Sequence, residues 1–105
     1  LPARDVVAMA TREGARAAGL GARKGRLTAG MDADLIVVDL SSPHLIPSYD
    51  PYSSLVYAAG RSDVAHVMAR GRPIVADRRI VADVTSDIAA VRAVASSISA
   101  SALRA

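Results

Sequence analysis

Three aspartates stand around the most apolar segment of the chain, in the stretch GRLTAGMDADLIVVD that runs from residue 25 to residue 39. Carboxylates beside a buried strand are the groups that a metal site or an acid–base pair needs. Asp34 and Asp39 are separated by five residues, about 16 Å of extended chain, so they cannot share a metal ion or a proton. Asp32 and Asp34 can approach each other, but no His or Cys lies near them. The pattern therefore favours a turn at Asp32 and the start of a strand at Asp34.

The two histidines occur in separate contexts. His44 lies in a proline-rich loop, where it is either exposed to solvent or orders the loop. His66 alternates with Val and Met, as a half-buried structural histidine does. Neither belongs to an H-x-H or H-E-x-x-H motif, and the chain has no G-x-S-x-G, G-x-G-x-x-G or P-loop motif. We expect the arginines near the predicted turns to be solvated: Arg61, Arg70, Arg72, Arg78 and Arg79. The residues themselves predict no catalytic, cofactor-binding or metal-binding site in this chain.

The composition limits the classes of function. At 105 residues the chain is one small domain, and it contains no Phe, Trp or Cys, which excludes disulfides and thiolate chemistry and leaves few large side chains for a core. The net charge is +3, but the basic residues are scattered among the acidic ones and do not form one stripe. Together with the lack of stacking aromatic side chains, this argues against a nucleic-acid partner. The longest apolar run, residues 35–38, is too short to cross a membrane. With no signal-peptide pattern, we expect a cytoplasmic protein without membrane partners.

Apolar spacing predicts an α+β fold. A helix over residues 2–18 places Val6, Met9, Ala10 and Ala17 on one stripe. A strand over residues 33–40 is apolar without alternation at its centre, which predicts burial on both faces and neighbours on both sides. A short helix follows, with Asp50 as its N-cap and Pro51 at its first position. Strands are then predicted over residues 63–69, 74–76 and 80–81, with turns at 70–73 and 77–79. The last element is a helix that begins near Thr85, has Thr85 or Ser86 as its N-cap and frays after Ser96; its apolar stripe consists of Ile88, Val91, Val94, Ala95 and Ile98.

Two long motifs resemble the C-terminal signature of the amidohydrolase superfamily of metal-dependent hydrolases. The first is ATREGARAAGLGARKGRLTAGMDADLIVVDL, and the second is YDPYSSLVYAAGRSDVAHVMARGRPIVADRRI. The second is similar to the deaminase and chlorohydrolase branch, which includes cytosine deaminase, S-adenosylhomocysteine deaminase and atrazine/triazine hydrolase. The chain departs from that branch at Arg70, where Asn or Asp often precedes the Gly-Arg of the turn.

The resemblance implies a fold and a role. It makes residues 1–20 the last helix of a (β/α)8 barrel, residues 21–84 the C-terminal strands of a small composite β-sandwich, and residues 85–105 a closing helix. The family's catalytic groups lie upstream of the matched region, so no residue of this chain takes them over. The implied activity is hydrolysis of non-peptide carbon–nitrogen bonds, in which metal-activated water deaminates or hydrolyses a heterocyclic ring substrate, with zinc or iron in the full-length enzyme. The fragment alone would be inactive.

Two alternatives stay open beside this interpretation. One is a stand-alone structural or interaction module of the composite-sandwich type. The other is a small independent enzyme that uses Asp32, Asp34 and His66. Because the chain begins with Leu1 and lacks large core side chains, we expect its partner to be a missing N-terminal part of an enzyme. We also expect homo-oligomers that form through open sheet edges.

Overall fold

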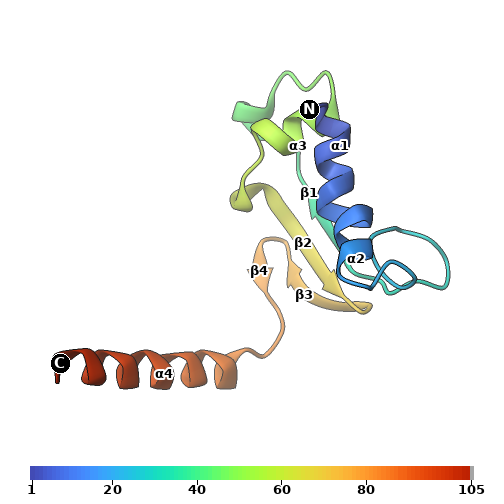
Figure 1. The fold of residues 1–105 in the computed structure, drawn as a ribbon. Helices are drawn as coiled ribbons and strands as arrows, with labels where there is room; N and C mark the ends of the chain where they lie inside the picture. The colour runs from blue at the N-terminus through green and yellow to red at the C-terminus, as the bar shows by residue number, and fades with distance from the viewer. Residues whose placement is uncertain (105) are drawn as a thin grey trace.

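The computed structural model describes residues 1–104 and places a helix, an antiparallel sheet and a projecting helix in succession (Figure 1). The N-terminal helix runs alongside the sheet, with its first part beside α3 (Pro51–Tyr57), and α4 (Thr85–Leu103) extends from the last strand. Short 3-10 turns at Pro43–Leu45 and Arg61–Asp63 connect these parts. Helices and an antiparallel sheet confirm the α+β class.

The sheet is a four-stranded antiparallel meander in the order β1-β2-β3-β4, with bounds Leu35–Val38, Val64–Ala69, Arg72–Ala76 and Arg79–Ile80. Val37 pairs with His66, and Val75 pairs with Ile80. The predicted meander is confirmed, but the turns are shorter than expected. Arg70 and Gly71 have φ of 50° and 76°, and Asp77 and Arg78 have φ of 47° and 63°. Two consecutive positive φ angles are typical of two-residue type I′ turns, so β3 begins at residue 72 and β4 at residue 79.

The N-terminal helix contains one wide turn. It consists of α1 (Ala3–Ala8), a π-helical turn (Met9–Glu13) and α2 (Gly14–Ala17), which together confirm the predicted extent. The predicted single stripe is wrong beyond Val6: Met9, Ala10 and Ala17 are exposed, whereas Val7 and Ala15 are half-buried. A π turn holds one residue more than an α turn, so it shifts the face presented by the residues that follow it.

Helix α3 begins as the sequence predicts. The Asp50 carboxylate accepts hydrogen bonds from the backbone N–H groups of Tyr52 (3.2 Å) and Ser53 (3.1 Å), which are two of the donors that the first helical turn leaves unpaired. The Ser53 hydroxyl donates to the same carboxylate at 2.6 Å and lowers the pKa of Asp50. The Arg4 guanidinium lies 4.7 Å from the centre of the Tyr52 ring, a cation–π contact that joins α1 to α3.

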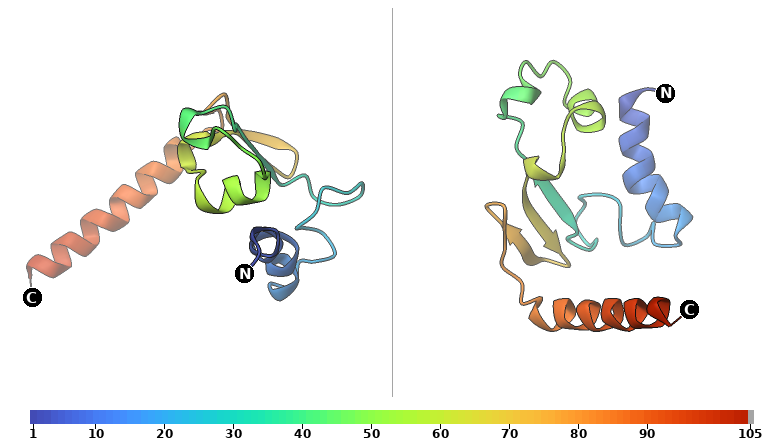
Figure 2. Two further views of the ribbon diagram at one scale, coloured as in Figure 1. Left: turned by 90° about the horizontal axis from the view of Figure 1, so that it is seen from above. Right: turned by 90° about the vertical axis from the view of Figure 1, so that its left-hand side faces the viewer.

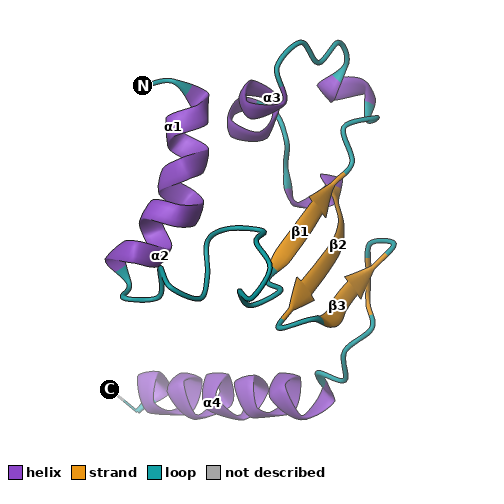
Figure 3. Ribbon diagram, turned by 90° about the vertical axis from the view of Figure 1, so that its right-hand side faces the viewer, coloured by secondary structure: helices purple, strands orange, loops and turns teal. Residues whose placement is uncertain are grey.

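The core of the described residues is small. Only Leu45 and Ala65 are buried apolar residues, with 3% and 8% of their surface exposed. The expected burial of the β1 strand on both faces is not found in this chain, since Ile36 and Val37, which point to opposite faces, are 59% and 46% exposed. The expected neighbours on both sides are not found either, because β1 is an edge strand that pairs with β2 alone. Figure 3 shows the open side of β1 facing the long loop that follows α2.

Helix α4 stands apart from the rest of the chain, and both views in Figure 2 show it projecting beyond the sheet. Every residue from 85 to 103 is exposed. The predicted N-cap is wrong, since the Asp83 carboxylate accepts the Thr85 N–H at 3.0 Å. The helix also continues to Leu103 where fraying was expected after Ser96. Ala105, the last residue of the expected closing helix, lies outside the described residues. None of the helices described here is long and apolar enough to cross a membrane.

Candidate functional site

The candidate carboxylates Asp32 and Asp34 meet one lysine. The Lys24 ammonium forms ion pairs with both, at 3.2 Å from an Asp32 oxygen and in close contact with Asp34. Arg23 adds a second cation, 3.0 Å from Asp32, and the other oxygen of Asp34 accepts the backbone N–H of Arg70 at 2.7 Å. The Lys24 hydrogen bond is the main reason why the pKa of each carboxyl lies below its usual value. The same bonds, Asp34 first, raise the pKa of Lys24. This cluster is a set of ion pairs that ties the loop after α2 to the β2–β3 turn.

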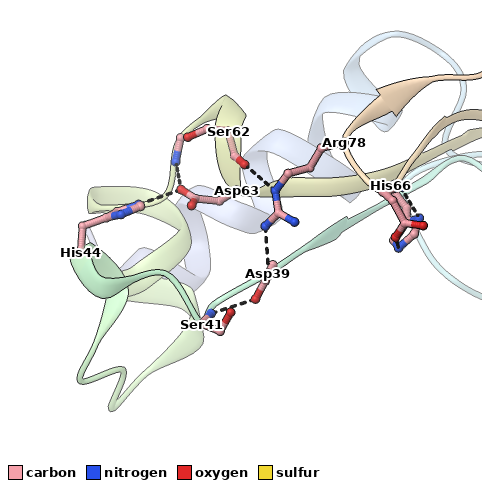
Figure 4. A network of polar contacts seen from close by, with 9 residues as sticks. Asp39, Ser41, His44, Ser62, Asp63, His66 and Arg78 are labelled. Carbon is pink, nitrogen blue, oxygen red and sulfur yellow. Dashed lines mark hydrogen bonds and ion pairs between the residues drawn. The ribbon is translucent and has the colours of Figure 1, made fainter.

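Asp39 belongs to a second network, drawn in Figure 4. Its carboxylate accepts the Ser41 N–H at 2.9 Å and the Arg78 guanidinium, also at 2.9 Å. Hydrogen bonding to Ser41 and then to Arg78 holds the pKa of Asp39 well below its usual range. The Arg78 Nε–H also donates to the Ser62 carbonyl at 3.0 Å. The expectation that Arg78 is merely solvated is therefore wrong. Arg78 attaches the β3–β4 turn both to Asp39, which follows β1, and to Ser62 in the 3-10 turn that precedes β2.

His44 pairs with the most buried polar residue among those described, Asp63, which is 1% exposed. The His44 Nε2 atom lies 2.9 Å from Asp63 Oδ2, and the same oxygen accepts the Gly60 N–H at 2.8 Å (Figure 4). The Gly60 N–H, followed by His44, lowers the pKa of Asp63. This contact confirms the loop-ordering interpretation of His44, since it fixes the proline-rich loop to the start of β2. Sequence reasoning missed Asp63 as the partner; its signal is the spacing Gly60-x-x-Asp63, which suits a carboxylate that closes a turn on a backbone N–H.

His66 lies on β2, away from that pair. Its side chain is 45% exposed, and its Nδ1 accepts the Asp77 N–H at 3.4 Å. The Nε2 atom lies 3.6 Å from the Asp77 carboxylate. The half-buried structural histidine that the sequence predicts is what the structure shows.

The residues described here do not fit a metal ion. Within residues 1–104 no three His, Cys, Asp or Glu side chains gather in a way that could hold one. Each histidine contacts a different aspartate, and Asp32, Asp34 and Asp39 are occupied by cationic side chains. These ion pairs and hydrogen bonds have a structural role, since they attach the loops to the sheet.

The comparisons with known proteins place this chain in a family of hydrolases. The amidohydrolase family pattern matches residues 1–74, more than half of the chain. The chain belongs to the amidohydrolase family. The matched region contains the ion pairs of Lys24 with Asp32 and Asp34 and the His44–Asp63 pair, whereas Arg78 of the second network lies beyond it.

Several curated members of the family share this segment. The chain is 54% identical over 81 residues to a 5-methylthioadenosine/S-adenosylhomocysteine deaminase of Syntrophobacter fumaroxidans, covering 77% of this chain and 18% of that protein. It is 48% identical over 81 residues to a 5′-deoxyadenosine deaminase of Methanosarcina mazei, with the same coverage. The chain thus spans about a fifth of the length of the curated relatives that it matches.

Solved structures of the family contain the same fold. An adenosine deaminase from Xanthomonas campestris with bound zinc superposes with a TM-score of 0.77 at 39% identity, over 88% of this chain and 21% of that one. An atrazine chlorohydrolase from Arthrobacter aurescens complexed with zinc gives a TM-score of 0.74 at 29% identity, over 89% of this chain and 20% of that one. The resemblance to the deaminase and chlorohydrolase branch is confirmed, and these two relatives hold zinc.

Proposed function

We propose that this chain is the C-terminal structural segment of a metal-dependent amidohydrolase that deaminates adenine nucleosides. The observation that carries the proposal is the 54% identity over 81 residues to a deaminase of 5-methylthioadenosine and S-adenosylhomocysteine. A relative named for 5′-deoxyadenosine supports the same substrate class. The reaction class is hydrolysis of the bond between the ring carbon and its exocyclic amino nitrogen, with release of ammonia. The metal, zinc or iron, is held by residues outside the described part of this chain.

In this proposal the chain supplies architecture. Residues 1–20 form the last barrel helix, residues 21–84 the C-terminal strands of a composite β-sandwich, and residues 85–105 a closing helix. The open edge of β1 and the exposed Ile36 and Val37 support the assignment of the middle segment, because an apolar edge strand needs a neighbour.

An apolar cleft between the N-terminal helix and the sheet points the same way, with Leu20, Leu27, Leu35, Ile36, Val67 and Met68 among the residues that line it. Strands from the preceding part of the enzyme would cover this edge and cleft. Where that part is missing, the edge of a second copy takes its place.

The test is an assay of the polypeptide in which this segment is encoded, compared with the 105-residue chain alone. We expect the longer protein to release ammonia from 5′-methylthioadenosine and 5′-deoxyadenosine and to contain zinc or iron by elemental analysis. The chain alone should bind no stoichiometric metal and show no turnover. Turnover by the chain alone that is lost in Asp34→Asn would overturn the proposal. So would a longer protein with no H-x-H motif and no deaminase activity, which would favour the stand-alone module.

A further inference from the structure

Helix α4 has an unpartnered apolar face with the spacing of a coiled coil. Five apolar residues recur at alternate intervals of three and four residues: Ile88, Val91, Ala95, Ile98 and Ala102. These are the a and d positions of two successive heptads and the a position of a third. All five are exposed; Val91 and Ile98 leave 69% and 64% of their surface free. The helix is 19 residues long, about 28 Å, and nothing in the described part of the chain covers this face.

The charges on α4 specify how a second helix fits. Asp87 and Arg92 are its only charged residues between Thr85 and Leu103. They occupy positions g and e, on the two flanks of the apolar stripe, and they are five residues apart, so they cannot pair with each other on one helix. Neither forms an ion pair among the described residues. In a parallel two-stranded coiled coil, position g faces position e of the next heptad on the other helix. An antiparallel pair instead places g against g and e against e.

We propose that α4 forms a parallel, in-register coiled coil with α4 of a second copy of this chain. Asp87 of each copy then faces Arg92 of the other, and symmetry makes this two ion pairs. Alanine at positions 95 and 102 lets the helices approach closely, while Ile88, Val91 and Ile98 supply the apolar contact. Because α4 projects from the sheet (Figures 1 and 2), the two sheets can lie at the same end of the pair. A two-helix contact of this length buries a small area, so we expect the dimer to be weak or transient.

Disulfide trapping tests the register. The chain contains no cysteine, so Ala95→Cys and Ala102→Cys each introduce a single thiol on the apolar stripe. Ala93→Cys is a matched control, since it is also an exposed alanine of α4 but lies at position f, on the opposite side of the helix. We expect both stripe variants to form disulfide-linked dimers under mild oxidation, with the control at least about tenfold slower. An antiparallel pair brings at most one of the two stripe positions against its own copy.

Charge reversal tests the ion pairs. Asp87→Arg and Arg92→Asp each replace attraction by repulsion at two places, and each should weaken dimerisation by about fivefold in sedimentation equilibrium at low salt. The double variant exchanges the two signs and should restore the wild-type affinity, whereas in an antiparallel pair it would restore nothing. Far-UV circular dichroism on all three variants checks that α4 remains helical.

Three results would overturn the proposal. They are a strictly monomeric chain at every concentration, equal trapping at positions 93 and 95, and a double variant no tighter than the single ones. If α4 instead packs against another part of the longer enzyme, Ala95→Cys forms no disulfide-linked dimer in that protein, and this result also contradicts the proposal. None of these outcomes depends on deaminase activity, so the proposed function stands or falls separately.

Discussion

Gly25 lies where the loop after α2 crosses the wide turn of the N-terminal helix. Its φ is +94°, and a Cβ added there would sit 2.8 Å from the Cα of Arg12, 3.0 Å from the Cβ of Ala15 and 3.0 Å from the Thr11 carbonyl oxygen. Two of these three contacts are to backbone atoms, which cannot move aside as the end of a long side chain can. We therefore predict that Gly25→Ala destabilises the chain.

The magnitude has two parts, and Gly30 separates them. An L-residue in the left-handed region costs about 1–2 kcal/mol, and forcing an extra methyl group into occupied space costs about 1–3 kcal/mol, so the free energy of unfolding should fall by about 2–5 kcal/mol in Gly25→Ala. Gly30 has nearly the same φ, +90°, but a Cβ there would meet nothing within 4 Å. Gly30→Ala is thus the matched control and should cost only the conformational part, about 1–2 kcal/mol.

Urea unfolding of both variants and the wild-type chain, followed by far-UV circular dichroism, measures the two costs. The loss in Gly25→Ala should exceed the loss in Gly30→Ala by about 1–3 kcal/mol. Equal losses in the two variants would show that the loop does not press on the helix, and the reasoning from the close approach would be refuted.

Three further predictions concern the polar networks and the sheet edge. The pKa of Asp63 is lower in the folded state than in the unfolded state. The ionised Asp63 side chain therefore contributes its full stabilisation above the unfolded pKa of about 3.9, and this stabilisation is lost as the pH falls through the folded pKa. Asp63→Asn should flatten the acid limb of the stability–pH curve, and an unchanged limb would contradict this. Arg78→Ala should raise the Asp39 pKa part of the way towards its usual value in an NMR titration, because the Ser41 bonds remain, whereas Arg79→Ala should leave it unchanged. Ile36→Lys, on the open edge of β1, should lower edge-mediated self-association several-fold in light scattering, and undiminished association would show that copies meet elsewhere.

Local signals predicted the elements whose stabilising groups are close in sequence. Asp50 followed by Pro51 located the start of α3, and its carboxylate does accept the first free N–H groups of that helix. The alternation around His66 predicted β2, and the alternating and turn residues predicted the meander. The turns were misjudged because Arg70 and Arg78 adopt positive φ. Residues other than Gly, Asn and Asp seldom adopt this conformation, so the sequence does not indicate it.

The contacts that fasten the loops could not be predicted from spacing. Lys24 reaches a carboxylate 10 residues away, His44 one that is 19 residues away, and Arg78 one that is 39 residues away. Which basic side chain meets which carboxylate depends on the paths of the loops between them, and no local pattern encodes those paths. The negative prediction, that Asp34 and Asp39 do not form a shared site, rested only on the length of an extended strand. It agrees with the separate partners that the structure gives them.

The wide turn at Met9–Glu13 also bears on how this segment tolerates changes in length. A π turn is an α-helix with one residue added, so deleting one residue between Met9 and Glu13 would return the helix to a regular repeat. Because the wide turn absorbs the added residue, the side chains that follow it would keep nearly the same direction relative to α1 after the deletion. Ala15 would stay in the position in which it touches the Gly25 loop. Among amidohydrolases that carry this segment, a one-residue gap in this part of the helix should therefore occur without a change in the loop that follows it.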